Sequence, residues 1–180
     1  LPNEPCRTWT EFYATQRLLP LARLAKDGLA LEDRAVRDLE TVAGRLLELG
    51  GAPEPPARLH GDLWAGNRVV GTAGRNWLID PAAHGSHREF DLAMMRLFGG
   101  FGAACFSSYE ADFPLGKGWR DRVALHQLAP LVVHEVQRHL SITSKRAREG
   151  LERASNSRDW SVDYCTSRST ASSLFPLPAE

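Results

Sequence analysis

Hydrophobic side chains recur every three or four residues over much of the chain, and this spacing is typical of amphipathic helices. A first helix is expected from about residue 8 to 27, and Pro20 bends it or begins a new turn. A second helix is expected over 32–49. A third is expected to begin at Ser86, where a glutamate three residues later completes a capping-box pattern, and a fourth covers about 119–140. The pattern therefore predicts a mainly helical core.

Two short stretches break the helical period. Residues 68–70 and 76–79 are rich in Val, Trp, Leu and Ile, and glycines lie between them, so they predict a small β-hairpin. The proline-rich connector 51–56 before them is expected to be extended, because proline fixes φ and disfavours helix in the residue that precedes it. The expected fold class is therefore mainly α, with a small β component (α+β).

The composition of the chain changes near residue 141. Residues 141–180 are rich in serine and poor in large apolar side chains, so they bury too little surface to offset the entropy lost on ordering. We therefore expect one globular unit over residues 1–140 and an atypical polar, partly disordered tail over 141–180. Within that tail, residues 144–154 can extend a solvated helix.

The polar residues that suggest chemistry gather at 59–67, a segment that reads Leu-His-Gly-Asp-Leu-Trp-Ala-Gly-Asn. An aspartate, an asparagine five positions later and a distal aspartate beyond a hairpin have the spacing of a phosphoryl-transfer catalytic loop. In that arrangement Asp62 orients the acceptor hydroxyl and takes its proton. Asn67 and Asp80 bind Mg²⁺, a hard cation that prefers oxygen ligands. The simpler alternative makes all three turn or cap residues, since Asp and Asn favour such positions.

The segment 59–67, with Asp80-Pro81, 89–93 and 98–101, resembles the fructosamine kinase (ketosamine 3-kinase) family. That family is similar in fold to aminoglycoside phosphotransferases and, more remotely, to protein kinases. The likeness covers about residues 1–133. It implies the helical C-terminal lobe of a protein-kinase-like fold over residues 1–140, with a catalytic loop at 59–67 and a metal-binding hairpin at 68–81.

The resemblance also implies ligands and partners. ATP would be the phosphoryl donor, Mg²⁺ the metal, and a small-molecule or protein-bound ketosamine the acceptor. Such kinases need a glycine-rich loop, a lysine on a strand and its glutamate partner, and none of these is found before residue 59. The resemblance therefore implies a small nucleotide-binding lobe before residue 1, and we expect residues 1–180 alone to bind ATP weakly or not at all.

Three further residues near the loop have alternative interpretations. His60 is either a second catalytic group or a hydrogen-bonded support of the turn, and we favour the support. Trp64 either stacks on a sugar or anchors the core, and by resemblance it faces the sugar. By the same resemblance, Asp91 accepts backbone N–H bonds from the catalytic loop and is structural. His84 and His87, with Glu89 nearby, have a zinc-like spacing, but no cysteine or third ligand completes a tetrahedral set.

Composition narrows the class of partner. Lysine plus arginine number 22, as do aspartate plus glutamate, so charge gives no reason to expect nucleic acid or an anionic membrane as a partner. The apolar runs are too short to span a bilayer. Three scattered cysteines and the lack of a signal-peptide pattern predict a reducing, cytoplasmic location.

Three functions stay open on the sequence alone. The first is a kinase that phosphorylates a ketosamine hydroxyl. The second is a non-catalytic remnant or sugar-binding lobe. The third is a phosphotransferase of the aminoglycoside or choline type, for which Asp62, Asn67 and Asp80 would serve equally well.

Overall fold

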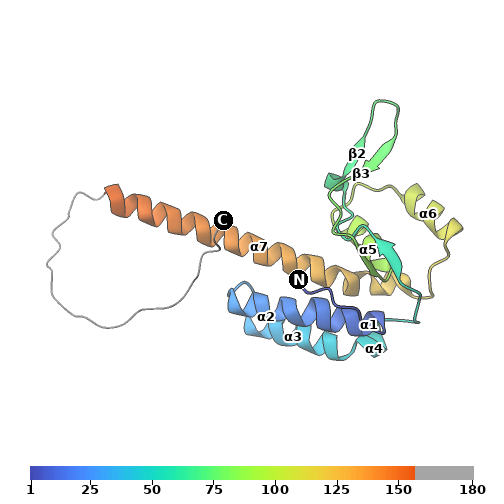
Figure 1. The fold of residues 1–180 in the computed structure, drawn as a ribbon, viewed down its shortest axis with the longest axis horizontal. Coiled ribbons are helices and arrows are strands. Elements are labelled where there is room, and N and C mark those ends of the chain that lie inside the picture. The colour runs from blue at the N-terminus through green and yellow to red at the C-terminus, as the bar shows by residue number, and fades with distance from the viewer. Residues whose placement is uncertain (157–180) are drawn as a thin grey trace. The chain divides into compact units, whose positions relative to one another are not determined.

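The computed structural model describes residues 1–156 and confirms the predicted fold class, mainly helical with a small hairpin (Figure 1). Its helices are α1 (Trp9–Phe12), the π-helix η1 (Tyr13–Leu18), α2 (Leu19–Asp27), α3 (Asp33–Gly44), α4 (Leu46–Leu49), the 3₁₀ turn η2 (Ala65–Asn67), α5 (Glu89–Leu97), α6 (Ala103–Asp112) and α7 (Trp119–Asn156). Its strands are β1 (Ala57–Leu59), β2 (Arg68–Val70), β3 (Asn76–Leu78) and β4 (His84–Ser86).

Contacts divide the chain into two units, Leu1–Thr143 and Ser144–Glu180. The described part of the second unit, residues 144–156, is helical and forms the end of α7. The predicted disordered part of the tail falls mainly on residues 157–180, which lie outside the described residues.

The first helical segment begins at the capping box that the sequence predicts. Thr8 Oγ1 accepts a hydrogen bond from Glu11 N at 3.2 Å, and Glu11 Oε2 accepts one from Arg7 N at 3.1 Å. The predicted single helix over 32–49 is wrong in one detail, because Arg45 leaves the helical conformation and separates α3 from α4. The helices α2 and α3 pack side by side (Figure 1).

The hydrophobic core lies where these N-terminal helices meet α7. Its members are fully buried or nearly so and come from η1, α2, α3, α4, β1, α5 and α7: Tyr13, Leu18, Leu21, Ala22, Ala25, Val36, Leu39, Ala43, Leu46, Leu59, Phe90, Ala129, Val132 and Val136. Leu59 and Phe90 bring β1 and α5 into this core. The loop after β1 is therefore anchored on a packed base.

The hydroxyl of Tyr13 takes the place of a backbone hydrogen bond that Pro130 cannot make in α7. Pro130 has no N–H to bond the carbonyl of His126, the residue four positions earlier. The buried Tyr13 hydroxyl lies 3.3 Å from that carbonyl, donates to Leu125 O at 2.8 Å and accepts from Ala129 N at 3.3 Å. Burial raises the pKa of the phenol, so Tyr13 stays a neutral donor. Helix η1 is thereby fixed against the middle of α7.

Two antiparallel strand pairs flank the loop at residues 60–67. The predicted hairpin is confirmed, with Val69 opposite Trp77 in β2 and β3. The pairing of β1 with β4 was not predicted, and it places Ala57 opposite Ser86. The expected capping box at Ser86 is therefore wrong, because that residue belongs to a strand and α5 begins at Glu89 without a side-chain cap.

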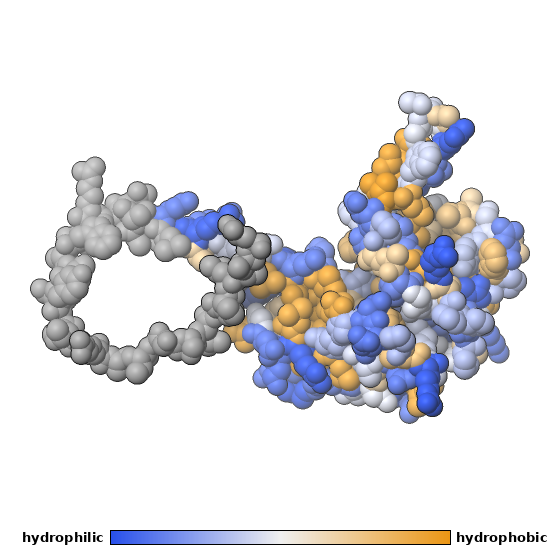
Figure 2. Space-filling view, viewed as in Figure 1, coloured by the Kyte–Doolittle hydropathy of each residue, from blue (hydrophilic) through white to orange (hydrophobic). Residues whose placement is uncertain are grey.

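The hairpin carries apolar side chains into solvent, visible as orange on the projecting segment in Figure 2. Val70, Trp77 and Leu78 are each more than half exposed. Apolar groups gathered on one small element are typical of a surface that another body covers. In the part of the chain that the structure describes, no helix has both the length and the apolar character needed to cross a membrane.

Candidate functional site

Asp91 links the loop at residues 60–67 to the first turn of α5. Its Oδ2 accepts a hydrogen bond from His60 N at 2.7 Å, and its Oδ1 accepts one from Gly61 N at 2.9 Å. Burial raises the pKa of Asp91, while these two N–H groups act in the opposite direction. The carboxylate thus satisfies two backbone donors of the loop and fixes where the loop begins.

His60 joins the loop to the exit of the hairpin. Its Nδ1 accepts from Asp62 N at 3.3 Å, so Nε2 carries the proton and donates to Ile79 O at 3.0 Å. Both ring nitrogens are therefore occupied by backbone groups. This geometry favours support of the turn over a direct chemical role.

Asp62 and Asn67 are in direct contact. Asn67 Nδ2 donates to the Asp62 carboxylate oxygen Oδ2 at 2.8 Å and to the Asp62 backbone carbonyl at 2.9 Å. Because both partners are acceptors, the amide nitrogen must face them and Oδ1 of Asn67 faces away. Within residues 1–156, neither Oδ1 of Asp62 nor Oδ1 of Asn67 has a hydrogen-bond partner. One oxygen of each side chain is left for a ligand.

Asp80 lies where the hairpin returns to the loop. The residue before it, Ile79, donates its N–H to Asn67 O at 3.0 Å. The carbonyl of Ala82, two residues after Asp80, lies against Gly61. The Asp80 side chain itself is exposed and has no hydrogen bond or ion pair with any residue from 1 to 156. The backbone thus brings Asp80 to the loop, but its carboxylate does not contact Asp62 or Asn67.

The backbone of Asp80 is in a conformation that L residues rarely adopt, with φ of 51°. Aspartate tolerates this region better than most side chains, but the conformation still costs free energy. Strained residues of this kind cluster at binding sites. The strained backbone of Asp80 is therefore consistent with a binding role for its carboxylate.

Two glycines allow the loop to pack as closely as it does. Gly61 has φ of 80°, and a Cβ added there would collide with the carbonyl oxygen of Ala82. A Cβ on Gly66 would collide with the indole ring of Trp64. These positions exclude side chains because backbone and ring already fill the space.

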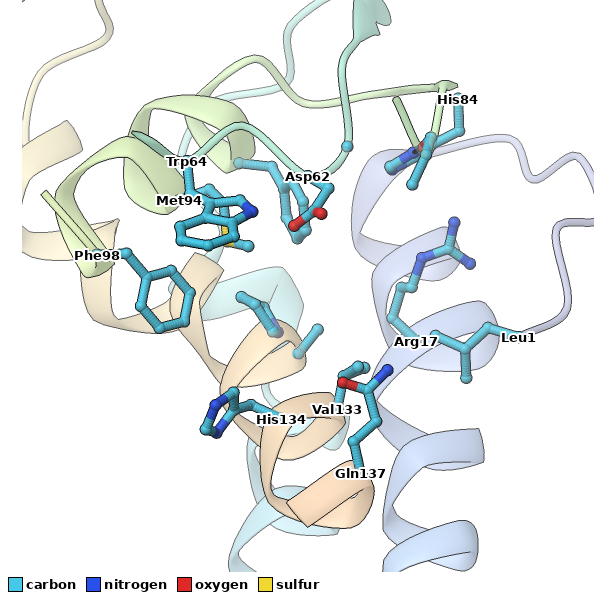
Figure 3. A pocket seen from close by; sticks show the side chains of 15 residues that line it. Leu1, Arg17, Asp62, Trp64, His84, Met94, Phe98, Val133, His134 and Gln137 are labelled. Carbon is cyan, nitrogen blue, oxygen red and sulfur yellow. Dashed lines mark hydrogen bonds between the residues drawn. The ribbon is translucent and has the colours of Figure 1, made fainter. Parts of the chain in front are cut away.

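Asp62 and Trp64 face a pocket of about 700 Å³ (Figure 3). Trp64 is 38% exposed and meets Phe98 edge to face, with ring centroids 5.8 Å apart. Figure 3 shows these two rings on one wall and Arg17 on the opposite wall. A pocket of this size, largely apolar with a few polar groups, is typical of a small-molecule site.

The sequence analysis missed most of the pocket wall. The missed residues come from three stretches that are far apart in the chain: Arg17, then His84, Met94 and Phe98, then His134 and Gln137. The three stretches are brought together only by the packing of η1, β4, α5 and α7. Spacing along the chain places Met94 and Phe98 on one helix face, but it does not link the three stretches to one another.

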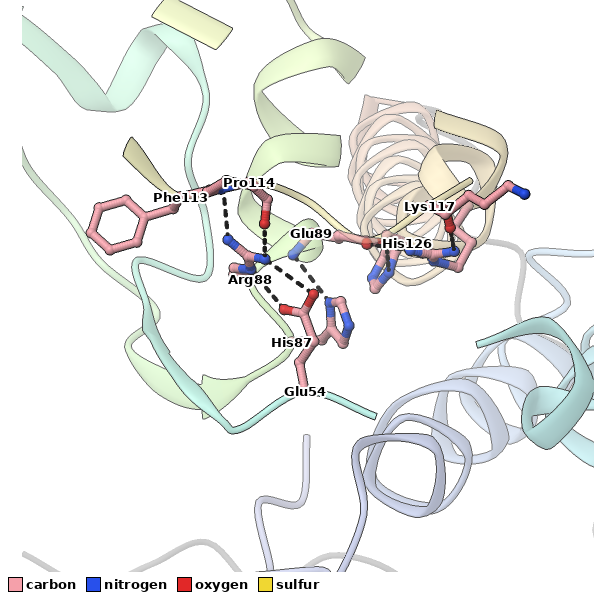
Figure 4. Close-up of polar contacts among 9 residues, drawn as sticks. Glu54, His87, Arg88, Glu89, Phe113, Pro114, Lys117 and His126 are labelled. Carbon is pink, nitrogen blue, oxygen red and sulfur yellow. Dashed lines mark hydrogen bonds and ion pairs between the residues drawn. The ribbon is translucent and has the colours of Figure 1, made fainter. Parts of the chain in front are cut away.

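A second polar cluster lies buried between α5 and α7 (Figure 4). His87, Glu89 and His126 are each at most 3% exposed, and one ligand atom from each lies within 4.8 Å of the others. Arg122 donates to both Glu89 oxygens, at 2.9 and 2.5 Å. His126 Nε2 lies 3.3 Å from Glu89 Oε2. His126 was not part of the zinc-like spacing considered from the sequence.

This buried cluster is better explained as a structural ion pair than as a metal site. A guanidinium bonded to both carboxylate oxygens already neutralises the carboxylate and would repel a cation electrostatically. Burial alone would raise the pKa of Glu89, but contacts with His126 and Arg122 lower it to about 2. Trp9 packs against His126 with ring centroids 4.7 Å apart and covers the cluster.

Comparison with known proteins identifies relatives of this chain in sequence and in fold. A family model described as fructosamine kinase matches residues 1–141. The chain is 37% identical to a probable ketoamine kinase of Lactiplantibacillus plantarum, covering 70% of this chain and 45% of that protein. It is 34% identical to the ketosamine-3-kinase of Mus musculus, covering 73% of this chain and 42% of that protein. The chain thus spans somewhat under half the length of these two relatives.

A solved structure extends the likeness to three dimensions. The putative fructosamine-3-kinase of Thermobifida fusca superposes with a TM-score of 0.72 at 46% identity, over 84% of this chain and 55% of that one. The family model covers well over half of the chain, and the fold and the sequence agree with it. This chain therefore belongs to the fructosamine kinase family.

Proposed function

We propose that this chain supplies the acceptor-binding and metal-binding part of an ATP- and Mg²⁺-dependent kinase that phosphorylates a hydroxyl of a ketosamine. The single observation that carries the proposal is the pair formed by Asp62 and Asn67, in which one hydrogen bond orients the carboxylate and leaves one oxygen of each side chain open. Family membership makes phosphoryl transfer the expected chemistry.

In this proposal Asp62 is the catalytic base. Its Oδ2 is held by Asn67, so Oδ1 is free to accept a proton from the acceptor hydroxyl in the pocket. The backbone bonds from His60 and Gly61 to Asp91 keep the loop from shifting when the acceptor binds. Positioning of this kind is the main contribution that a protein makes to phosphoryl transfer.

Asn67 and Asp80 would hold Mg²⁺. Both offer uncommitted oxygen atoms, as this hard cation requires, and Ile79 joins their backbones. When bound, the metal would neutralise charge on the transferred phosphoryl group.

Trp64 and Phe98 would form the wall on which the sugar rests. An exposed indole beside the base offers an apolar face for the C–H groups of a sugar. The exposed apolar residues of the β2–β3 hairpin support a further part of the proposal, in which a nucleotide-binding half covers them. In this view residues 1–180 alone bind ATP weakly or not at all.

The test is phosphate transfer by a fusion. Residues 1–180 are joined to the portion of the Thermobifida fusca relative that this chain does not match, and radiolabelled phosphate transfer from MgATP to a fructosamine is measured. We expect transfer to the fructosamine and little to choline or an aminoglycoside. Preference for either of those alcohols would indicate a phosphotransferase of that type. Binding of the fructosamine without turnover would favour a sugar-binding remnant instead.

A further inference from the structure

The wall of the pocket opposite Trp64 carries a cation without an anionic partner. Arg17 lines the pocket with Asp62 and lies on η1, the π-helix Tyr13–Leu18 (Figure 3). π-Helical turns are rare, and they occur frequently at functional sites. The turn that carries Arg17 is fixed by the Tyr13 hydroxyl in the gap beside Pro130, so its position is set by the core.

Every hydrogen-bond acceptor that Arg17 contacts is a neutral oxygen. Nη1 donates to the carbonyls of Pro2 and Gln16 at 2.7 and 2.9 Å, and Nη2 donates to Asn3 Oδ1 at 2.9 Å. The guanidinium carbon also lies 4.5 Å from the centroid of the Phe12 ring. Across residues 1–156, no carboxylate lies within ion-pair distance of this side chain.

Two of the other half-buried arginines of the unit contrast with Arg17, whereas Arg68, like Arg17, donates only to neutral oxygens, those of Asn76 and Gly100. Arg88 pairs with Glu54, and Arg122 pairs with Glu89. Burial lowers the pKa of Arg17, because its charge is partly desolvated. Within residues 1–156, its Nε–H and one of its two Nη2–H groups make no hydrogen bond, so donors remain for the forked contact that matches a carboxylate.

We propose that Arg17 binds the carboxylate of the acceptor, so that the preferred acceptor is a ketosamine formed on a free α-amino acid. This inference rests on the proposed function and specifies its substrate class. The sugar lies against Trp64 beside Asp62, and the amino-acid carboxylate reaches the Arg17 wall. A ketosamine on a lysine side chain within a protein has no carboxylate near its amine and forgoes this contact.

The test compares two acceptors that differ only in charge. Fructosyl-glycine has a free carboxylate, and fructosyl-glycinamide has a neutral amide of nearly the same shape. Binding of each to residues 1–180 is measured by isothermal titration calorimetry. We expect fructosyl-glycine to bind about tenfold more tightly, as a charge-assisted hydrogen-bond pair predicts.

The variant Arg17→Gln should remove this tenfold preference and leave the affinity for fructosyl-glycinamide unchanged, which also shows that the pocket is intact. The matched control Arg23→Gln removes the same charge from an exposed position on α2 and should keep the preference.

Each other outcome overturns a defined part of the account. Equal affinity of the unaltered chain for the two acceptors overturns the inference but leaves the proposed function standing. Equal weakening of both acceptors in Arg17→Gln also overturns it, because Arg17 would then only support the fold. Failure of the unaltered chain to bind either acceptor overturns the proposed function and the inference with it.

Discussion

The buried cluster and the loop at residues 60–67 both contain carboxylates, but the two regions differ in how these carboxylates are paired. In the buried cluster, both oxygens of Glu89 are held by Arg122, and His126 lies beside them. In the loop, Asp62 has one oxygen held and one open, and Asp80 has none held by residues 1–156. The buried carboxylate is fully paired and the loop carboxylates are not.

The number of carboxylate oxygens already paired within the protein distinguishes a structural acidic group from a candidate ligand better than residue type does. Among the described residues, only His87, Glu89 and His126 bring three ligand atoms of His, Cys, Asp or Glu within 4.8 Å of one another, so distance alone would select this cluster as the metal site. The Glu89 carboxylate, however, is already neutralised by Arg122. A cation would have to displace this guanidinium from a site that is almost fully buried. Open oxygens beside a pocket, as at Asp62 and Asn67, are available without that cost.

The largest expected effect is on catalysis. In the fusion described above, Asp62→Asn should reduce phosphate transfer about a thousandfold, because the proposed base is lost. Its melting temperature should hardly change, since the loop stays bonded to Asp91. The control Asp38→Asn, on the exposed face of α3, should retain full transfer. Transfer that survives in Asp62→Asn would remove the base from the proposal.

The next effect is on stability and comes from the buried cluster. Glu89→Gln should lower the free energy of unfolding by about 3 kcal/mol, because it leaves the Arg122 charge buried without its partner. Urea denaturation measures this change. Glu110→Gln breaks the more exposed pair with Arg120 and should cost under about 1 kcal/mol. Similar costs for the two variants would contradict the structural importance of burial here.

The buried cluster should also make stability depend on pH. Burial lowers the pKa of His87 and His126 below the usual 6.5, so the unfolded chain binds more protons and the free energy of unfolding should decrease as pH falls through about 6.5. Glu89, held at a pKa of about 2 against a usual 4.5, adds stability that is lost as pH falls from 4.5 towards 2. Glu89, Arg122 and Glu54 are the charged groups around these imidazoles.

Urea denaturation at a series of pH values measures this dependence. His126→Gln should flatten the decrease near pH 6.5, because one of the two buried imidazoles is then absent. A free energy of unfolding that stays constant between pH 7 and 5 in the unaltered chain would contradict the burial of neutral histidines.

The smallest expected effect is a gain in stability at Asp80, and it contrasts the loop most sharply with the buried cluster. Asp80→Gly should raise the free energy of unfolding by up to about 1 kcal/mol, because glycine adopts a φ near 51° without strain. The same change should weaken metal binding at least tenfold. Leu29→Gly, at a φ of 52° on the surface, should bring a similar gain in stability and leave metal binding intact. A loss of stability in Asp80→Gly would mean that its carboxylate supports the fold.

The sequence was most informative where structure depends on neighbours along the chain. The hairpin at 68–79 and the Thr8 cap follow from local residue choices, and both are present. The error at Ser86 has a non-local cause, because the pairing of β4 with β1 outweighs a local capping pattern. Propensity near one residue carries no information about a strand that pairs with it from a distance.

The residues of the candidate site also fall into two groups, those that spacing along the chain predicts and those that only the fold brings together. Asp62 and Asn67 are five positions apart, so their spacing alone suggested that they meet. Arg17 and His126 reach their clusters only through the packing of η1 and α5 against α7, across more than thirty residues of sequence in each case. Spacing along the chain cannot reveal such partners before the fold is known.

The central claim is that Asn67 and Asp80 bind one divalent cation, whereas the buried cluster binds none. Titration of the isotope-labelled chain with Mn²⁺, followed by paramagnetic broadening of backbone amide signals in NMR, tests it directly. We predict that broadening begins around Asp62, Asn67 and Asp80 and requires at least tenfold more Mn²⁺ in Asp80→Asn. Broadening centred on His87, Glu89 and His126, or broadening that Asp80→Asn leaves unchanged, would contradict the account.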